Sequence, residues 1–328
     1  MKVLFFQNPP KNWEELLNKA KEEENFKGEI DFYFNNEMDK VINDVEVIIG
    51  GVSDGDIIKK AKNLKLIQSP YAGVDPIPFD VIREKGILVS NAHENALSVA
   101  EHGFALMLAL SKSLIIHDRE LRKSVWHGWL ANEPNFEIYG KTLGIIGLGS
   151  IGREMAKRAK AFGMKVVGTK KDSNKDIDKL KDYVDEIYPM EKIDEVIKKS
   201  LFIFLSVPLT KETENLISEK ELSLMKDKYL INISRGRVVN EEALYNALKN
   251  GILKGAAIDV WYVYPKSGEK SYPSKYPFHE LDNIIMTPHS GGFTVESLQR
   301  NWLFTFKNII KFAKGEKIEN IVNPEKQY

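Results

Sequence analysis

A glycine-rich segment near the middle of the chain constrains its fold more than any other feature. The sequence Gly147-x-Gly149-x-x-Gly152 follows a short apolar run at 143–146, typical of a buried strand, and precedes an amphipathic helix. The first glycine permits a tight turn, the second lets a pyrophosphate approach the backbone, and the third lets helix and strand pack closely. Unpaired N–H groups and the positive end of the dipole at the helix start favour phosphates. With a second strand expected at 165–168, the segment predicts a dinucleotide-binding unit.

Composition narrows the class of protein. At 328 residues the chain is long enough for two domains of ordinary size. The formal net charge of zero argues against binding to nucleic acid or a membrane surface, and the absence of cysteine excludes disulfides and thiolate chemistry. No apolar run is long enough to span a bilayer, and the apolar start at 1–6 is too short for a signal peptide. We therefore expect a cytoplasmic enzyme.

Strand-like and helix-like segments alternate along the whole chain, which predicts parallel sheets with helices on both faces. The first series carries no phosphate fingerprint, whereas the glycine-rich unit opens a second series. A long apolar helix is expected between them at 97–116, and an isolated last helix near 295–313 is expected to return to the first series. The expected strands are 3–6, 30–34, 45–49, 64–68 and 87–90, then 143–146, 165–168, 201–206, 229–233, 256–260 and 284–287.

The end of the second strand of the glycine-rich unit bears on the choice of cofactor. A cofactor with a free 2′-hydroxyl calls for an acidic side chain about twenty residues past the glycines. The sequence instead has Thr169, Lys170 and Lys171 there, a hydroxyl donor and two cations that suit a 2′-phosphate. These lysines could equally be exposed turn residues, with Asp172 as the ribose partner after a small change of register. We favour NADP over NAD.

Three later segments place reactive side chains at the ends of predicted strands. Arg235 follows the strand at 229–233, and parallel sheets bind ligands at the carboxyl ends of their strands. The planar fork of arginine suits a carboxylate. Asp259 ends the next strand, and His289 stands in a glycine-bearing turn after the last strand. Singly, these residues could form a surface ion pair, cap a turn or be structural. Their joint occurrence behind a glycine-rich unit favours a catalytic site.

Eight short motifs are together similar to those of one enzyme family. They are Tyr71-Ala-Gly-Val-Asp75, Val99-Ala-Glu101, Gly128-Trp129, Gly147 to Gly152, Val207-Pro-Leu-Thr210, Asn232-Ile-Ser-Arg-Gly236, Ala257-Ile-Asp-Val260 and Thr287-Pro-His-Ser290. In these motifs, over nearly its whole length, the chain resembles the D-isomer-specific 2-hydroxyacid dehydrogenases. The resemblance implies two Rossmann-like α/β domains, with a nucleotide domain at 95–292 inserted into a discontinuous, flavodoxin-like substrate domain at 1–94 and 293–328. It also implies a homodimer with its active site in the cleft between the domains.

The resemblance also implies a role for each site residue. Arg235 would hold the carboxylate and carbonyl of a small 2-oxo acid, such as glyoxylate or hydroxypyruvate. His289 would protonate the ketone oxygen as the nicotinamide delivers hydride, giving the D-hydroxy acid. The substrate's carboxylate would also meet the backbone at Tyr71, Ala72, Gly73 and Val74. The cofactor would contact Gly147, Gly149, Ser150, Ile151 and Gly152 at its pyrophosphate, and Pro208, Thr213, Ile233, Ser234, Asp259, Ser290 and Gly291 elsewhere.

One position departs from the family pattern. The family usually has a glutamate five residues after the aspartate, where its carboxylate orients the histidine and raises its proton affinity. This chain has Tyr264 there, followed by a longer loop. A tyrosine hydroxyl can still hydrogen-bond an imidazole, but it carries no negative charge at neutral pH. We therefore expect a less stabilised His289 imidazolium and an acid limb of the rate profile moved to lower pH. Glu269 or Glu280 of the loop could instead substitute for the missing carboxylate.

Two other functions stay open on the sequence alone. A relative that lost catalytic power with the glutamate could sense dinucleotide redox state through a protein partner, although Arg235 and His289 are retained. A formate-type dehydrogenase also lacks the glutamate, because hydride leaves formate without coupled proton transfer, but that branch carries glutamine at this position. No histidine has metal-ligand spacing, so no metal is expected.

Overall fold

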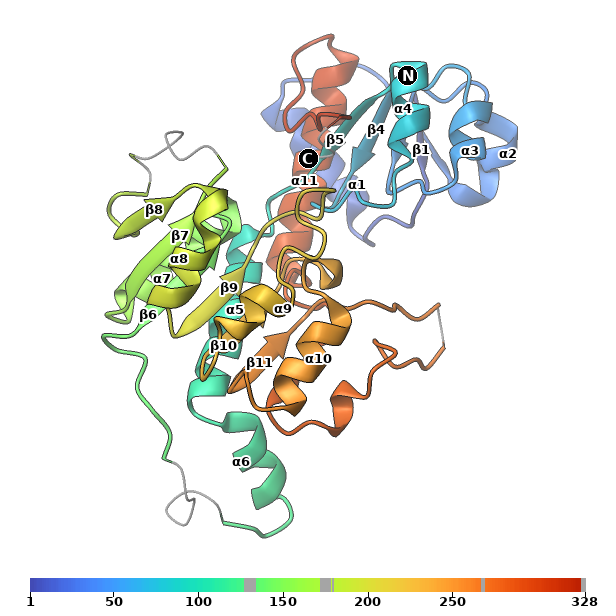
Figure 1. The fold of residues 1–328 in the computed structure, drawn as a ribbon. Helices are drawn as coiled ribbons and strands as arrows, with labels where there is room; N and C mark the ends of the chain where they lie inside the picture. Colours follow the sequence, from blue (N-terminus) through green and yellow to red (C-terminus); the bar gives the residue numbers. More distant parts are fainter. Residues whose placement is uncertain (127–133, 172–177, 179, 267–268, 326–328) are drawn as a thin grey trace. The chain divides into compact units, whose positions relative to one another are not determined.

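The protein, represented by a computed structural model (Figure 1), is described for residues 1–126, 134–171, 178, 180–266 and 269–325. It divides into two compact units, Met1–Asn95 with Phe293–Tyr328, and Ala96–Gly292. The expected domain boundary at 94/95 lies one residue before the observed one, and the boundary at 292/293 coincides with it. Each unit is built on a parallel sheet, which confirms the predicted fold class.

The first unit has a five-stranded sheet in the flavodoxin-like order β2-β1-β3-β4-β5. Apolar side chains alternate between its two faces, since Val3 and Phe5 of β1 belong to one core cluster and Leu4 to the other. Central strands covered on both faces are apolar throughout. The elements are β1 (Lys2–Phe5), α1 (Trp13–Glu23), β2 (Asp31–Phe34), α2 (Met38–Val41), β3 (Val47–Ile49), α3 (Gly55–Lys60), β4 (Leu66–Ser69), α4 (Phe79–Lys85) and β5 (Leu88–Asn91).

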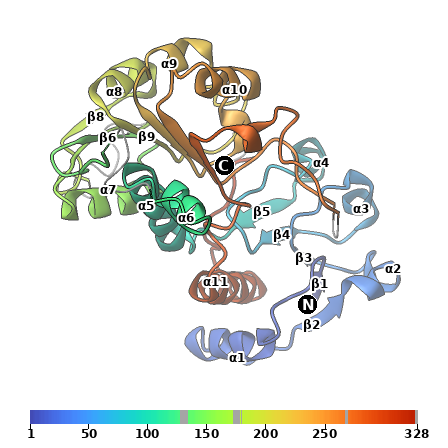
Figure 2. The same ribbon diagram turned by 90° about the horizontal axis from the view of Figure 1, so that it is seen from below.

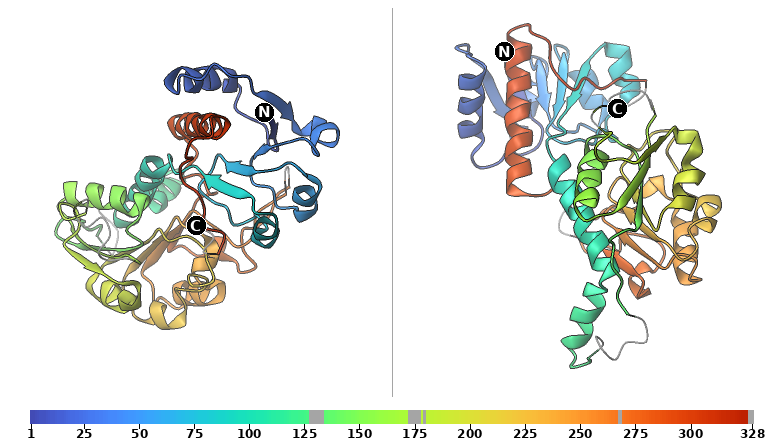
Figure 3. Two further views of the ribbon diagram at one scale, coloured as in Figure 1. Left: turned by 90° about the horizontal axis from the view of Figure 1, so that it is seen from above. Right: turned by 90° about the vertical axis from the view of Figure 1, so that its left-hand side faces the viewer.

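The last helix, α11 (Val295–Ala313), belongs to this first unit, as expected. It lies beside α1 in Figures 2 and 3. Its Trp302 and Phe306 rings pack against Phe5 of β1, with centroids 6.0 and 6.4 Å away. The chain therefore covers one face of its first sheet with its first and last helices.

A buried amide ties the segment after α11 to the sheet. Asn308 Nδ2 donates to Gln68 Oε1 of β4 at 3.0 Å and to Ser90 Oγ of β5 at 2.8 Å. The backbone N–H of Glu319 donates to Asn308 Oδ1 at 2.8 Å, and Asn308 Nδ2 also reaches the Glu319 carbonyl. Both ends of this polar side chain are thus satisfied, as a buried amide requires.

The second unit has a seven-stranded parallel sheet in the order β12-β11-β10-β9-β6-β7-β8. Read from its first strand, this is the Rossmann order with one added edge strand, and the order reverses between β6 and β9, where such sheets bind ligands. The elements are α5 (Ala96–Ser111), α6 (Leu114–Leu121), β6 (Thr142–Ile146), α7 (Ser150–Ala161), β7 (Lys165–Thr169), β8 (Glu186–Tyr188), α8 (Ile193–Lys199), β9 (Phe202–Leu205), α9 (Glu219–Ser223), β10 (Tyr229–Asn232), α10 (Glu241–Lys249), β11 (Gly255–Ile258) and β12 (Ile284–Met286).

The prediction of one long helix at 97–116 is wrong at its C-terminal end. The core helix α5 ends at Ser111, and α6 begins after Ser113, whose φ is +50°. The axes of the two helices differ by 64°. No residue of α6 is buried, and α6 projects from its unit in Figures 1 and 3. No single helix in the described residues is long and apolar enough to cross a membrane, whereas the bent pair meets that criterion by length and composition alone.

Candidate functional site

The predicted phosphate-binding turn joins β6 to α7 at the point where the sheet order reverses. Gly147 has a φ of +104°, and a Cβ added there would lie 2.8 Å from Val207 Cγ1. A Cβ on Gly152 would lie 2.3 Å from the Gly147 carbonyl oxygen. Ser206 Oγ donates to that same oxygen at 2.8 Å, and the Gly147 N–H donates to Thr169 Oγ1 at 3.3 Å. Steric contacts fix this turn, together with hydrogen bonds to Thr169 at the end of β7 and Ser206 just after β9.

The start of α7 is open to a ligand. Gly149 is exposed, and a Cβ added to it would meet no atom of the described residues within 4 Å. Among the described residues no side chain caps the helix, so the N–H groups of its first turn, at Ser150 and Ile151, face no capping oxygen there. A phosphate can approach such a helix start closely, and the helix dipole favours its negative charge. These residues fit the pyrophosphate of a dinucleotide.

The end of β7 only partly matches the expected 2′-phosphate pocket. Thr169 is fully buried and accepts the Gly147 N–H, so its hydroxyl belongs to the glycine turn rather than to an exposed surface. Lys170 is partly exposed, and Lys171 Nζ lies 2.6 Å from Glu212 Oε2. The two cations remain near the predicted site, while the alternative ribose partner, Asp172, lies outside the described residues. His127, Gly128 and Trp129 also lie outside them.

Other expected cofactor contacts lie in loops that are held by their own side chains. Thr213 Oγ1 donates to the Pro208 carbonyl at 2.6 Å, and Pro208 itself is exposed. Ser234 is buried, and its hydroxyl donates to Asn232 Oδ1 at 2.7 Å. Ile233 is also buried. The hydroxyls of Thr213 and Ser234 therefore shape the loops that follow β9 and β10.

Arg235, Asp259 and His289 follow three neighbouring strands of the second sheet. The strands β10, β11 and β12 pair in parallel, with Asn232 beside Ile258 and Ile258 beside Met286. Their carboxyl ends thus lie on one edge of the sheet, the edge that also carries the glycine turn after β6. The three residues predicted from strand ends are therefore presented along one edge of a single sheet.

The turn that carries Arg235 packs directly on the segment after β11. A Cβ on Gly236 would lie 2.3 Å from the Trp261 carbonyl oxygen, so only glycine fits there. Arg235 is partly exposed, and its Nη1 donates to the Ser234 carbonyl at 2.7 Å. The planar fork of an arginine suits a carboxylate.

Asp259 organises the turn that carries His289. Its carboxylate accepts the Ser290 and Gly291 N–H groups, each at 3.0 Å, and the Thr287 hydroxyl at 2.6 Å. Burial alone would raise the pKa of this carboxyl, but these hydrogen bonds and one from His102 outweigh burial and hold the pKa below its usual value. His289 sits at φ +56°, a left-handed conformation that its neighbours' hydrogen bonds maintain. Asp259, Ser290 and Gly291 are thus parts of one rigid turn.

The imidazole of His289 contacts the residue that departs from the family pattern. Tyr264 Oη lies 2.9 Å from His289 Nδ1, and the Trp261 N–H donates to the same oxygen at 3.2 Å. Both Tyr264 and His289 are exposed, as are Glu269 and Glu280. Glu280 lies 3.9 Å from His279. The residue found against Nδ1 is therefore the tyrosine.

Two residues that none of the sequence motifs singled out complete this arrangement. His102 of α5 places Nε2 3.3 Å from Asp259 Oδ1 and 3.2 Å from Thr287 Oγ1. The indole N–H of buried Trp261 donates to the Thr287 carbonyl at 2.8 Å. Both therefore support the histidine turn. A lone histidine on an apolar helix gives no local signal of this role.

In the first unit, the segment from Tyr71 to Val74 follows β4. Ser69 Oγ donates to the Tyr71 carbonyl at 3.0 Å, and Asn91 Nδ2 donates to the Ala72 carbonyl at 2.6 Å. Ala72 and Gly73 are partly exposed, and Val74 is buried. The segment is thus held through these carbonyl groups and through the Tyr71 N–H, which donates to Ser69 Oγ at 3.2 Å.

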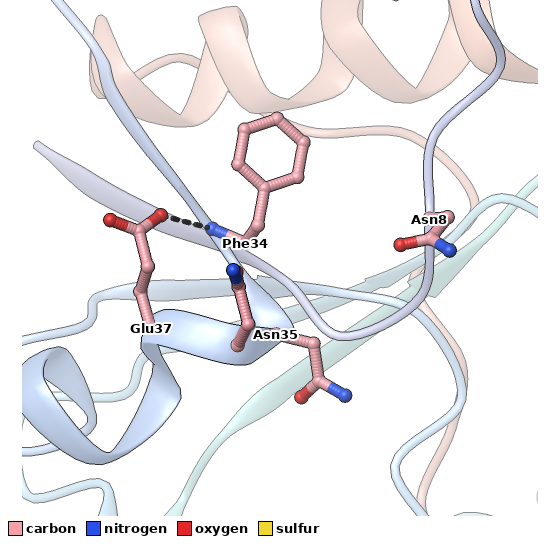
Figure 4. A pocket seen from close by; sticks show the side chains of 5 residues that line it. Asn8, Phe34, Asn35 and Glu37 are labelled. Carbon is pink, nitrogen blue, oxygen red and sulfur yellow. Dashed lines mark hydrogen bonds between the residues drawn. The ribbon is translucent and has the colours of Figure 1, made fainter.

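A separate hollow of about 660 Å³ lies beyond the ends of β1 and β2 in the first unit (Figure 4). Asn8, Phe34, Asn35, Asn36 and Glu37 line it, and the Glu37 carboxylate accepts the Phe34 N–H at 3.0 Å. None of the predicted site residues lines this hollow. Within the described part of the chain, no group of three or more histidine, aspartate or glutamate side chains could hold a metal.

The fold and the glycine turn define a dinucleotide-binding α/β protein. The family model for the NAD-binding domain of D-isomer-specific 2-hydroxyacid dehydrogenases matches residues 104–291. The glyoxylate reductase of Pyrococcus furiosus is 33% identical over 99% of this chain and 96% of its own length. The chain therefore belongs to the D-isomer-specific 2-hydroxyacid dehydrogenases, a family of oxidoreductases, which confirms the resemblance seen in the sequence motifs.

Two further relatives show the breadth of this similarity. The D-3-phosphoglycerate dehydrogenase of Methanocaldococcus jannaschii is 37% identical over 88% of this chain, which spans only 53% of that relative. A solved acyclic imino acid reductase in complex with NADPH and D-Arg is 29% identical, with a TM-score of 0.81 over 98% of this chain and 100% of that chain. The fold is therefore shared by relatives whose names give different substrates.

Proposed function

We propose that this protein is a 2-oxo acid reductase that uses NADP(H) in preference to NAD(H) and forms a D-2-hydroxy acid from a small substrate such as glyoxylate or hydroxypyruvate. The observation that carries the proposal is the presentation of Arg235 and His289 along the sheet edge that bears the glycine turn. The similarity to a glyoxylate reductase over 99% of the chain supports the substrate class.

The chemistry assigns one task to each residue. When bound, the dinucleotide supplies hydride to the carbonyl carbon. Arg235 holds the substrate's carboxylate and offsets charge on its carbonyl oxygen. The electron pair of the broken C=O π bond moves to that oxygen, which takes a proton from His289. Asp259, His102 and Trp261 keep the histidine turn in place. The amides of Ala72, Gly73 and Val74 are proposed carboxylate ligands from the first unit.

The test is reduction of a panel of 2-oxo acids with NADPH and NADH by the wild-type protein and matched variants. We expect His289→Gln to lower kcat by roughly 10²–10⁴-fold, the usual contribution of a general acid. Arg235→Gln should chiefly raise KM. Arg237→Gln is the control, because Arg237 is exposed, lies two residues further on and pairs with Glu214. Full activity in both site variants would refute the assigned roles.

The same assay tests the cofactor preference. Lys170→Asp should lower kcat/KM for NADPH relative to NADH by roughly tenfold or more, because it removes a charge-assisted contact and adds repulsion. An unchanged ratio would remove Lys170 from the phosphate pocket. Dinucleotide binding without turnover of any acid, even when both cofactors are tried, would favour a redox-sensing protein over an enzyme.

A further inference from the structure

An ion pair joins the two loops that flank the glycine turn. Lys171 follows β7 and Glu212 lies in the loop after β9, and Lys171 Nζ is 2.6 Å from Glu212 Oε2. We propose that Glu212 is a cofactor-selectivity residue, whose carboxylate occupies Lys171 where a 2′-phosphate would bind and so weakens the binding of NADP(H) relative to NAD(H). The inference rests on the proposed function, which places a 2′-phosphate at the end of β7.

The order of the strands places this pair at the nucleotide-binding edge of the sheet. β6 pairs with β7 on one side and with β9 on the other. The two outer strands are therefore about 10 Å apart, twice the spacing of neighbouring strands. Since the side chains of Lys171 and Glu212 are in contact, the loops that carry them close this gap beyond the end of β6, where the glycine turn begins.

Backbone hydrogen bonds fix the segment that precedes Lys171. The Leu148 N–H of the glycine turn donates to the Thr169 carbonyl at 2.8 Å, and the Lys170 N–H donates to the Tyr188 carbonyl of β8 at 2.9 Å. Lys171 therefore follows directly on a segment that is tied to the phosphate-binding turn. In such units the 2′ position of the ribose lies at the end of the second strand, about twenty residues past the glycines. The ammonium group is thus near the expected 2′-phosphate.

The loop that carries Glu212 is held by its own hydrogen bonds. The Thr210 N–H donates to Thr213 Oγ1 at 2.8 Å, and the hydroxyl of Thr213 donates to the Pro208 carbonyl at 2.6 Å. The Glu212 N–H donates to Thr210 Oγ1 at 3.2 Å. The backbone at Glu212 is therefore fixed locally, so its carboxylate stays within a side chain's reach of Lys171 even when a ligand displaces it.

The exposure of this pair allows it to exchange partners. The side chains of Lys171 and Glu212 are 54 and 72% exposed. An ion pair with this exposure contributes little to stability, so a phosphate can displace the carboxylate from the ammonium group. The displaced carboxylate then repels the phosphate from close by. A 2′-hydroxyl carries no charge and meets neither cost, so Glu212 discriminates between the two cofactors by acting against one of them.

The direct test is calorimetric titration of the intact protein with adenosine 2′,5′-bisphosphate and with 5′-AMP, which differ only in the 2′-phosphate. We expect Glu212→Gln to raise the affinity for the bisphosphate roughly two- to fivefold, the contribution of an exposed ion pair, and to leave the affinity for 5′-AMP unchanged. Glu214→Gln is the matched control, because Glu214 is exposed and lies 3.5 Å from Arg237. No gain in Glu212→Gln, or an equal gain for both ligands, would overturn the proposal.

A double-mutant cycle with Lys171→Gln separates competition for the ammonium group from repulsion alone. Lys171→Gln by itself should weaken binding of the bisphosphate but not of 5′-AMP. In the Lys171→Gln background, we expect most of the gain from Glu212→Gln to disappear, because the two residues act as a pair. The competition is overturned if Lys171→Gln leaves bisphosphate binding unchanged, or if Glu212→Gln gives the same gain in both backgrounds.

Titrations with NADPH and NADH distinguish failure of this inference from failure of the proposed function. If Glu212→Gln changes neither affinity while Lys170→Asp weakens the binding of NADPH, the inference fails and the proposed cofactor preference stands. If the wild type binds NADH more tightly but Glu212→Gln shifts the ratio of affinities towards NADPH, the proposed preference fails and the inference stands.

Discussion

At the residue scale, the position of Asp259 at the end of a strand could be predicted from the sequence, but its role could be predicted only in part. Its place at the end of a strand is encoded locally, in an apolar run followed by an acid. The sequence suggested a residue that lines the cofactor site, and the structure gives its carboxylate four partners within the protein. His102, which lies 185 residues before Thr287 in the sequence, contacts both Thr287 and Asp259. Contacts across such separations depend on the whole fold, so no local pattern could reveal them.

The lowered pKa of Asp259 has a measurable consequence for stability. The folded-state value lies below the usual 3.8, so the unfolded chain takes up the proton first as the pH falls. The contribution of the carboxylate is therefore complete above about pH 4 and is lost as the pH drops through the folded-state value. Asp259→Asn should lower the free energy of unfolding by roughly 1–3 kcal/mol at pH 7, with a smaller difference near pH 3.

Denaturant unfolding of this variant at several pH values checks the prediction. The exposed Asp282, whose side chain pairs with Arg119 at 2.9 Å, supplies the control. Asp282→Asn should change stability by about 0–1 kcal/mol at most, as for other surface ion pairs. Equal losses in the two variants, or a loss at Asp259 that does not vary with pH, would show that the turn does not depend on the buried charge.

At the element scale, most strands lie within two residues of their predicted positions, because buried parallel strands are short apolar runs between turn residues. One strand was not predicted, and one predicted helix is interrupted. The edge strand β8 (Glu186–Tyr188) is only three residues long and not buried, so its composition carries little signal. The break between α5 and α6 occurs at Ser113, without glycine or proline, while apolar residues continue into α6. A left-handed serine that bends the chain leaves no mark in hydrophobic periodicity.

The glycine turn yields a paired prediction at the same scale. Gly149→Ala should fold normally, because the new methyl group meets no atom within 4 Å in the part of the chain that the structure describes. It should nevertheless weaken dinucleotide binding by occupying the space that a pyrophosphate needs. Gly152→Ala should lose stability instead, since its Cβ would lie 2.3 Å from the Gly147 carbonyl. Thermal unfolding together with titration of NADPH separates the two effects. The turn is misassigned if Gly149→Ala binds as well as wild type.

At the scale of the whole molecule, α6 is the feature that bears on assembly. Leu114, Ile115 and Leu121 are each about half exposed, at 52, 53 and 51%, and the nearby Trp126 is 74% exposed. A helix with an apolar side and no buried residue favours a protein partner. We propose that this partner is a second copy of the chain, in keeping with the homodimer expected from the motifs.

Light scattering coupled to gel filtration tests this assembly. The wild type should have twice the 37.4 kDa mass of one chain, and the double variant Leu114→Lys with Ile115→Lys should run at the mass of one chain. Val295→Lys is the control, because Val295 is 69% exposed at the start of α11 in the other unit. A wild-type protein with the mass of one chain would exclude the dimer at the concentrations used.

The return of α11 to the first sheet also orders events during translation. The last strand of that sheet, β5, ends at Asn91, and the helix that completes its cover starts at Val295, about 200 residues later. A ribosome adding 5–20 residues per second needs roughly 10–40 s for that interval. All seven strands of the nucleotide-binding sheet are synthesised within it. All strands of the second sheet are therefore synthesised before Trp302 and Phe306. Until then, these two side chains cannot cover Val3, Phe5 and Ile49 of the first sheet.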